Sequence, residues 1–271
     1  MCKRFSHSAF PPVGPPGAIS FLRFACLCAV VLATCGWQPA GAQDASTPFD
    51  KKMQWITYSG DHQVKGRWGL HLDGSWREMT ASDWVQWLVR PGVNYSVSEN
   101  ADLQVTYSYF KVNPAGLNWD LKSFPENRLH QQIEVRHSRA GLPLRHRFRA
   151  EQRWFGAAFE RKGLDPGWMQ HRLRYLFGSS VPLANRAERG AVAYLSLYNE
   201  IMFRIKNAGV SAFEQNRVYA GMGLRPHQHW TIESGVFYQR VQPIRGGRME
   251  DNFVLHTTVR TNLPFGVLVG R

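Results

Sequence analysis

Apolar and polar residues alternate with a period of two along most of this chain. In the stretch 144–155, LRHRFRAEQRWF, charged residues occupy every second position from Arg145 to Arg153, and Glu151 fills one place in a series of arginines. Residues two apart share a face of a β-strand but point about 200° apart on a helix. The stretch is therefore predicted to be a strand with one charged face and one largely apolar face.

The same alternation predicts eleven strands with no amphipathic helix between them. The predicted strands are 53–64, 67–77, 85–97, 102–112, 128–138, 143–155, 168–178, 191–205, 213–225, 229–242 and 252–265. They run roughly 10–15 residues, which exceeds the usual sandwich strand of about five or six and suits a tilted strand that crosses a bilayer. We therefore predict an all-β fold, an antiparallel transmembrane β-barrel, with a soluble β-sandwich as the alternative.

Links between the predicted strands alternate in length. Short links fall near 98–101, 139–142 and 226–228, and longer ones near 113–127, 156–167 and 243–251. Short periplasmic turns and long outer loops are typical of outer-membrane barrels, although the link 179–190 is long on the predicted periplasmic side. Because single-chain bacterial barrels have even strand numbers, we expect about twelve strands, or ten if one weak segment is not a strand.

The first 42 residues are predicted to be a signal peptide, and 43–271 the barrel. The leader has three basic residues and no acid, an apolar run from Phe24 to Ala33, and the small-residue pattern Ala40-Gly41-Ala42. Cleavage is expected after Ala42. Lipoprotein processing at Cys35 is the alternative. Either route predicts export to the outer membrane of a Gram-negative envelope.

The positions of the cysteines and the net charge limit the possible classes of protein further. All four cysteines lie in the leader, so the mature chain is expected to be stable without disulfides. Removing the leader takes away Lys3, Arg4 and Arg23 and lowers the formal net charge from +13 to about +10. No Lys/Arg-rich run is long enough to be typical of a nucleic-acid-binding arm. We therefore expect no nucleic-acid partner.

Several segments resemble an uncharacterised bacterial outer-membrane family, the domain of unknown function 2490. These segments are QWITY at 54–58, LVRPGVNYSV at 88–97, ENRLHQQ at 126–132, LRHRFRAEQRW at 144–154, YNEIMF at 198–203 and QNRVYAGMGL at 215–224. The resemblance covers nearly all of the mature chain. It implies an outer-membrane β-barrel, and it supplies no established activity and no catalytic residues.

The charged strand faces are expected to line the barrel lumen, because an arginine facing lipid near the bilayer midplane costs about 2–4 kcal/mol. The predicted lumen residues are Glu134, Arg136, Arg145, Arg147, Arg149, Glu151, Arg153, Arg172, Arg174, Glu200, Arg204, Arg217, Glu233 and Arg260. The predicted lipid-facing residues are Leu70, Leu72, Val105, Tyr107, Phe148, Val218, Met222, Val259 and Leu263. The hairpin around 139–142 is expected to pair Ile133 with Ala150 and Glu134 with Arg149.

Two interpretations of this lumen remain open at this point. Excess positive charge on a low-dielectric wall concentrates anions, which predicts a narrow anion-preferring channel, of porin type, for small anionic solutes. Alternatively, glutamates neutralise part of the charge, and the side chains pack into a salt-bridged interior that conducts nothing. Both describe a non-catalytic barrel whose main partner is outer-membrane lipid, and for which no cofactor is expected.

A wall-embedded lipid-modifying enzyme, of the phospholipase or lipid A deacylase type, is the alternative function. Such an enzyme needs a nucleophile on the lipid face. Gln131, Gln152 and His171 are predicted to lie there, but no neighbouring lipid-facing serine accompanies them, and Ser138 points away from its neighbour His137. His227 and His229 could bind a metal ion, but no carboxylate or cysteine nearby completes a ligand set. No metal site is therefore expected.

Overall fold

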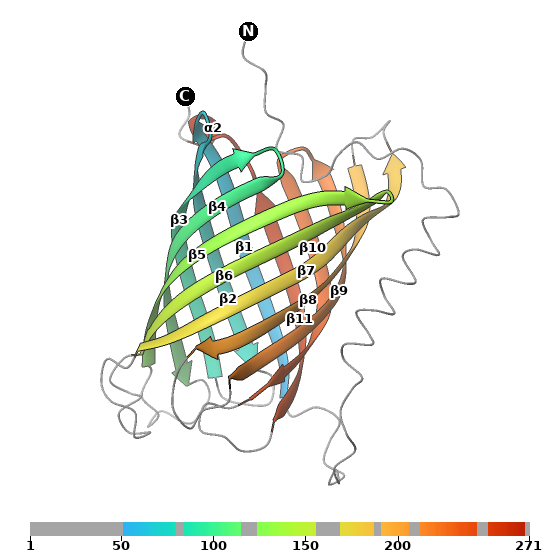
Figure 1. Ribbon diagram of the computed structural model, residues 1–271. Helices are drawn as coiled ribbons and strands as arrows, with labels where there is room; N and C mark the ends of the chain where they lie inside the picture. The colour runs from blue at the N-terminus through green and yellow to red at the C-terminus, as the bar shows by residue number, and fades with distance from the viewer. Residues whose placement is uncertain are drawn as a thin grey trace.

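Eleven strands form one closed β-barrel in the computed structural model of the chain (Figure 1). The structure describes residues 51–79, 84–114, 124–155, 169–186, 191–205, 212–242 and 249–268. The strands are β1 (Lys51–Lys65), β2 (Trp68–Met79), β3 (Trp84–Ser98), β4 (Ala101–Pro114), β5 (Phe124–Arg139), β6 (Leu142–Phe155), β7 (Met169–Arg186), β8 (Ala191–Ile205), β9 (Phe213–His227), β10 (Trp230–Val241) and β11 (Glu250–Thr261). Each matches one predicted strand, so the all-β barrel prediction is confirmed. The predicted leader lies outside the described residues.

The barrel closes through a parallel pair. Consecutive strands are antiparallel, whereas β1 and β11 run in the same direction, from Lys51 opposite Asn252 to Gly60 opposite Thr261. An odd number of alternating strands leaves the first and last strands parallel. The prediction of about twelve antiparallel strands was therefore wrong for the described chain, because the even-number rule assumes an antiparallel closing pair.

The two ends of the barrel differ in their connections. At one end, here called the turn end, two-residue turns at 66–67, 99–100, 140–141 and 228–229 join the strands. At the opposite end, here called the loop end, the links are longer. The link predicted at 179–190 is shorter than expected, because β7 extends to Arg186 and leaves only 187–190 between it and β8. All four two-residue turns therefore lie at the turn end, which is uppermost in Figure 1, whereas the shortest link at the loop end, 80–83, has four residues.

The β5–β6 turn fixes the register of the most charged hairpin. Ala140 and Gly141 have φ values of 54° and 81°, and positive φ at both central residues is the signature of a type I′ turn. Arg139 therefore pairs with Leu142, Ile133 with Phe148 and Glu134 with Arg147. The predicted pairing of Glu134 with Arg149 was wrong by two residues, because it assumed a longer turn. A shift of two leaves every side chain on its predicted face.

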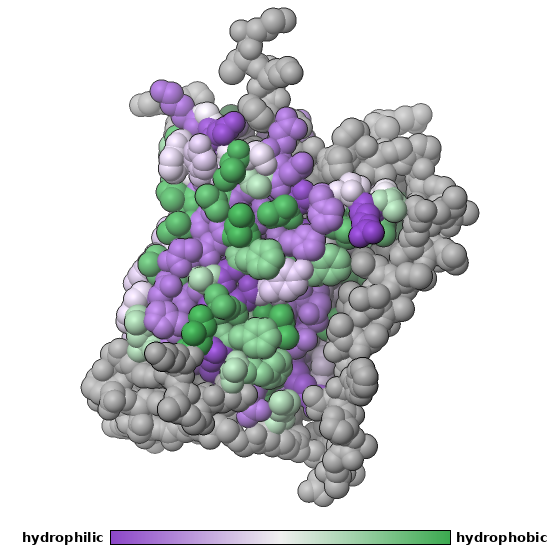
Figure 2. Space-filling view, in the orientation of Figure 1, coloured by the Kyte–Doolittle hydropathy of each residue, from purple (hydrophilic) through white to green (hydrophobic). Residues whose placement is uncertain are grey.

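The outer wall of the barrel is largely apolar. Leu70, Leu72, Val105, Phe148 and Met222 are between 38% and 61% exposed, and Tyr107 is also exposed. Val218 and Val259 lie on the same outer faces of β9 and β11 and are partly covered. Figure 2 shows apolar side chains across the middle of the visible wall, with polar ones among them.

Beyond β11 the chain packs back onto the outside of the barrel. Pro264 cannot donate a backbone hydrogen bond, so it does not extend a strand, and the short helix α2 (Phe265–Leu268) follows it. The Leu263 carbonyl oxygen lies 2.9 Å from Nδ1 of His62 on β1. Leu263, predicted as a lipid-facing strand residue, therefore lies past the end of β11. No helix in the described part of the chain is long and apolar enough to cross a membrane.

Candidate functional site

Five glutamates with almost no exposed surface lie inside the barrel. They are Glu126 on β5, Glu151 on β6, Glu200 on β8, Glu214 on β9 and Glu233 on β10, and their exposed fractions lie between 1% and 6%. A carboxylate removed from water is stable only when it is paired and hydrogen-bonded. Each of the five meets at least one guanidinium group, so they organise the lumen.

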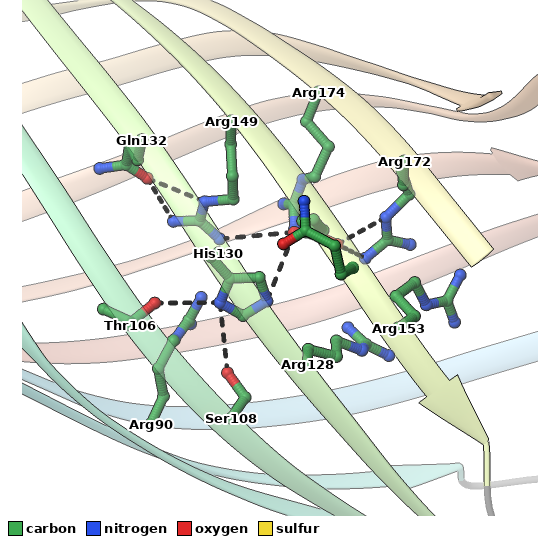
Figure 3. Close-up of polar contacts among 12 residues, drawn as sticks. Arg90, Thr106, Ser108, Arg128, His130, Gln132, Arg149, Arg153, Arg172 and Arg174 are labelled. Atoms are coloured by element: carbon green, nitrogen blue, oxygen red, sulfur yellow. Dashed lines mark hydrogen bonds and ion pairs between the residues drawn. The ribbon is translucent and has the colours of Figure 1, made fainter. Parts of the chain in front are cut away.

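Glu151 has more cationic neighbours than any other glutamate of the network described here. Arg172 binds its Oε2 through two guanidinium nitrogens, and Arg174 donates to Oε1 at 2.8 Å. Nη1 of Arg149 lies 3.9 Å from Oε1 and Nε2 of His130 lies 3.7 Å from it. Figure 3 shows Arg149, His130 and Arg172 directed from separate strands toward one region of the lumen.

Glu214 joins strands that are not neighbours. Its Oε1 accepts hydrogen bonds from Arg153 of β6 at 2.9 Å and from Arg172 of β7 at 2.8 Å, and Nε of Arg204 lies 3.7 Å from Oε2. Arg153 also binds Glu126 of β5 at 2.6 Å. Ion pairs therefore run from β5 to β9 through the loop-end half of the lumen rather than along adjacent strands.

Glu200 gathers a second group of arginines. Arg147 and Arg174 bind its carboxylate at 2.8 Å and 2.7 Å, and Nη1 of Arg217 lies 3.5 Å from it. One carboxylate thus faces three guanidinium groups, which leaves an excess of positive charge here. Farther toward the turn end, Glu233 accepts hydrogen bonds from Arg260 at 3.0 Å and from the Tyr194 hydroxyl at 2.8 Å.

Aromatic side chains fill the opposite side of the lumen. Trp55, Tyr219, Phe237 and Val254 form a buried cluster across β1, β9, β10 and β11. The guanidinium carbons of Arg77 and Arg217 lie 4.0 Å and 5.1 Å from the Trp55 ring centroid, and that of Arg128 lies 3.6 Å from the Phe110 ring centroid. Cation–π contacts of this kind stabilise arginines that lack a full carboxylate partner.

A protein-family model matches most of the chain. A family model described as "Protein of unknown function (DUF2490)" matches residues 53–250. The chain belongs to the DUF2490 family. The matched span of this DUF2490 chain runs from β1 to the first residue of β11 and includes all five buried glutamates. A comparison with curated proteins returns no match.

The DUF2490 barrel places the predicted lumen residues on its inner wall but does not bring them all together. Glu151, Arg153, Arg172, Arg174, Glu200 and Arg217 belong to the network described above. Nearer the turn end, Arg136 binds Asp102 and also Glu134, the latter at 2.9 Å. Arg145 lies opposite Arg136 on β6, and within the described strands it has no side-chain hydrogen bond or ion pair.

Several residues of the network were missed in the sequence. Glu126, Arg128 and His130 share the inner face of β5 with Gln132 and Glu134. Arg128 and His130 lie within the predicted strand 128–138, and Glu126 would have been found if the alternation had been followed to the start of β5. Asp73 and Arg90 form a 2.7 Å ion pair on β2 and β3. Glu214 could not be found this way, because alternation counted from Arg217 puts it on the outer wall.

His130 forms an arrangement that resembles a hydrolase triad. Its Nδ1 lies 3.0 Å from the Thr106 hydroxyl and 3.4 Å from the Ser108 hydroxyl, and its Nε2 faces Glu151. All four side chains are at most 2% exposed, so no substrate reaches the hydroxyl groups. The Glu151 carboxylate also binds Arg172 and Arg174, so it is not dedicated to orienting the His130 imidazole. The arrangement therefore serves packing rather than nucleophilic attack.

The polar cluster predicted on the outer wall forms, but without a nucleophile. Nε2 of Gln131 donates to the amide oxygen of Gln152 at 3.0 Å, and Gln152 lies opposite His171. The facing outer positions on the neighbouring strands, Leu129 and Ile205, are apolar. His227 and His229 lie at the β9–β10 turn with ring centroids 5.4 Å apart. In the described part of the chain, no group of three or more potential metal ligands forms.

Proposed function

We propose that this protein is a non-catalytic outer-membrane β-barrel whose lumen is closed to through-flow by its own ion pairs. The observation that carries the proposal is the position of Glu214, which binds Arg153 and Arg172 across intervening strands. Together with Glu151, it connects β5, β6, β7 and β9 inside the barrel. A structural envelope role therefore fits the lumen better than a porin does.

The degree of burial supports closure rather than conduction. The side chains of Arg153, Arg172 and Arg204 are 8%, 6% and 4% exposed, although they lie inside the barrel. Met202, Phe237 and Val254 are at most 1% exposed at the same loop-end level. An aqueous channel at this level would leave water-accessible surface on such side chains.

The outer wall supports a membrane location. Phe148 lies at the middle of β6 with half of its surface exposed, and its neighbours on the same wall are also apolar. A water-soluble protein rarely exposes a continuous apolar surface of this extent, whereas a lipid-facing barrel requires it. With the predicted signal peptide, this favours the outer membrane, with the turn end in the periplasm.

Fractionation of a Gram-negative host that expresses the full chain tests the location. The protein is expected in the outer-membrane fraction, and its unboiled form is expected to migrate differently from the boiled form on a denaturing gel. Mass spectrometry is expected to find Gln43, in free or cyclised form, as the first residue. Recovery in the soluble periplasmic fraction would contradict the membrane location, and a lipidated Cys35 would contradict the cleavage site.

A further inference from the structure

Arginine exposure rises along the lumen from the loop end to the turn end. The loop-end arginines Arg153, Arg172 and Arg204 are at most 8% exposed. The side chains of Arg147, Arg136 and Arg260 are 20%, 25% and 39% exposed. Arg136 and Arg260 lie close to the ends of β5 and β11 at the turn end. Several arginines of the turn-end half are therefore accessible, although Tyr194, Ser196 and Glu233 in the same half are buried.

Carboxylates do not follow this gradient. The side chains of Glu200 and Glu233 are 3% and 5% exposed, although their arginine partners remain accessible. Asp102 and Glu134 both pair with Arg136. Asp61 pairs with His71 at 2.7 Å, but its side chain remains 56% exposed. The guanidinium groups that a solute could reach therefore lie mainly on the β5–β6 side of the turn-end half.

Guanidinium donors in this half are left without protein acceptors. Arg145 lies opposite Arg136, although like charges directly opposite on neighbouring strands are unfavourable, and in the described part of the chain its side chain has no partner. Arg147 uses one terminal nitrogen on Glu200. Arginine presents planar, paired donors that match the oxygens of phosphate and carboxylate groups.

We infer that the turn-end half of the lumen is a closed-bottomed vestibule that binds a small, multiply charged oxyanion. Its floor is formed by Arg147 and Arg217 around the buried Glu200, and its rim carries Arg136, Arg145 and Arg260. Accessible guanidinium groups on a low-dielectric wall raise the local concentration of anions. The inference rests on the proposed function in one respect: the turn end faces the periplasm there, so the ligand is a solute of the periplasm.

Titration of inorganic pyrophosphate into the refolded, detergent-solubilised barrel tests the vestibule. Calorimetry is expected to show saturable binding that weakens as the salt concentration rises. The double variant Arg145→Gln/Arg147→Gln is expected to bind at least about tenfold more weakly, which is about 1.4 kcal/mol. The control Arg139→Gln removes one positive charge from the exposed β5–β6 turn and is expected to bind like the wild type.

Because Arg147 also binds Glu200, the double variant can fail to fold. In that case the single variant Arg145→Gln, which removes no ion pair between described residues, carries the test, and at least threefold weaker binding is expected. Absence of binding to the wild type, or an equal loss in Arg139→Gln, would overturn the vestibule. A steady current together with pyrophosphate binding would instead overturn the closed lumen and leave the anion site in place.

Discussion

Arg153 and Glu214 bind each other at 2.9 Å, although β7 and β8 lie between their strands in the barrel wall. The contact exists because β9 carries an extra residue where it meets β8. Met202 pairs with Gln215 and Phe203 with Phe213, so Glu214 is left between them. A β-bulge of this kind redirects a side chain, and here it places a carboxylate among three arginines.

Glu214→Gln is expected to destabilise the barrel by about 1–3 kcal/mol. The substitution removes a carboxylate shared by Arg153, Arg172 and Arg204, although Arg153 keeps Glu126 and Arg172 keeps Glu151, and the loss of one buried hydrogen-bond partner costs about that much. Urea unfolding in lipid vesicles, followed by tryptophan fluorescence, measures the change. The control Glu99→Gln removes a carboxylate from the exposed β3–β4 turn and should shift stability by less than about 0.5 kcal/mol. Equal stability of the two variants would mean that the loop-end ion pairs do not hold the lumen closed.

Phe148→Arg separates a lipid-facing wall from a water-facing one. In a bilayer the substitution places a charge near the midplane and is expected to cost about 2–4 kcal/mol. On a sheet that faces water it would have almost no effect, because Phe148 is already half exposed. The same unfolding assay applies, with Gln228→Arg at the β9–β10 turn as the control. If both variants remain as stable as the wild type, Phe148 does not face lipid.

Gly223→Ala tests the packing of the turn-end half. A Cβ at this position would overlap the ring of Tyr194, whose hydroxyl is held by Glu233. Overpacking of this kind costs about 1–3 kcal/mol. Gly74→Ala is the matched control, because a Cβ there meets no atom within 4 Å, and it should be neutral or slightly stabilising. A stable Gly223→Ala variant would show that Tyr194 moves freely in the lumen.

Ala140→Asn is expected to stabilise the β5–β6 hairpin. Ala140 has a φ of 54°, a conformation that costs most non-glycine residues about 1–2 kcal/mol and that asparagine tolerates better. The resulting Asn-Gly pair is the preferred type I′ sequence. The midpoint of urea unfolding should rise, corresponding to a gain of roughly 0.5–1 kcal/mol. Gly141→Ala should lower it, and an opposite order of the two midpoints would count against the turn assignment.

Alternation predicted the strands and their faces well, because both depend on local pattern. Leu70 and Phe148 are outside and Arg149 and Glu151 inside, as the period of two requires. Register and closure were predicted less well. The slip in the β5–β6 hairpin came from one turn whose conformation depends on Ala140, a residue that gives no turn signal. The parallel β1–β11 pair joins the first and last strands, and neither strand has a sequence pattern that predicts this pairing.

The network of ion pairs in the lumen could not be predicted from the sequence for a different reason. The alternation places Arg153 and Arg172 in the lumen but does not give their positions along the barrel axis. These positions decide which side chains contact each other across the interior. Glu214 adds a second obstacle, since its inward position depends on a bulge against β8. The difference in exposure between the loop-end and turn-end arginines depends on such cross-strand contacts.

Current through the refolded barrel in a planar bilayer is the measurement that tests the closed lumen most directly. The wild type is expected to carry no steady current, and Arg147→Gln/Arg149→Gln is expected to lower stability without revealing any ion selectivity. Glu214→Gln should produce current if the loop-end ion pairs are what closes the lumen. A steady, anion-preferring current through the wild-type protein, with a preference that falls in Arg147→Gln/Arg149→Gln, would contradict the account and restore the channel.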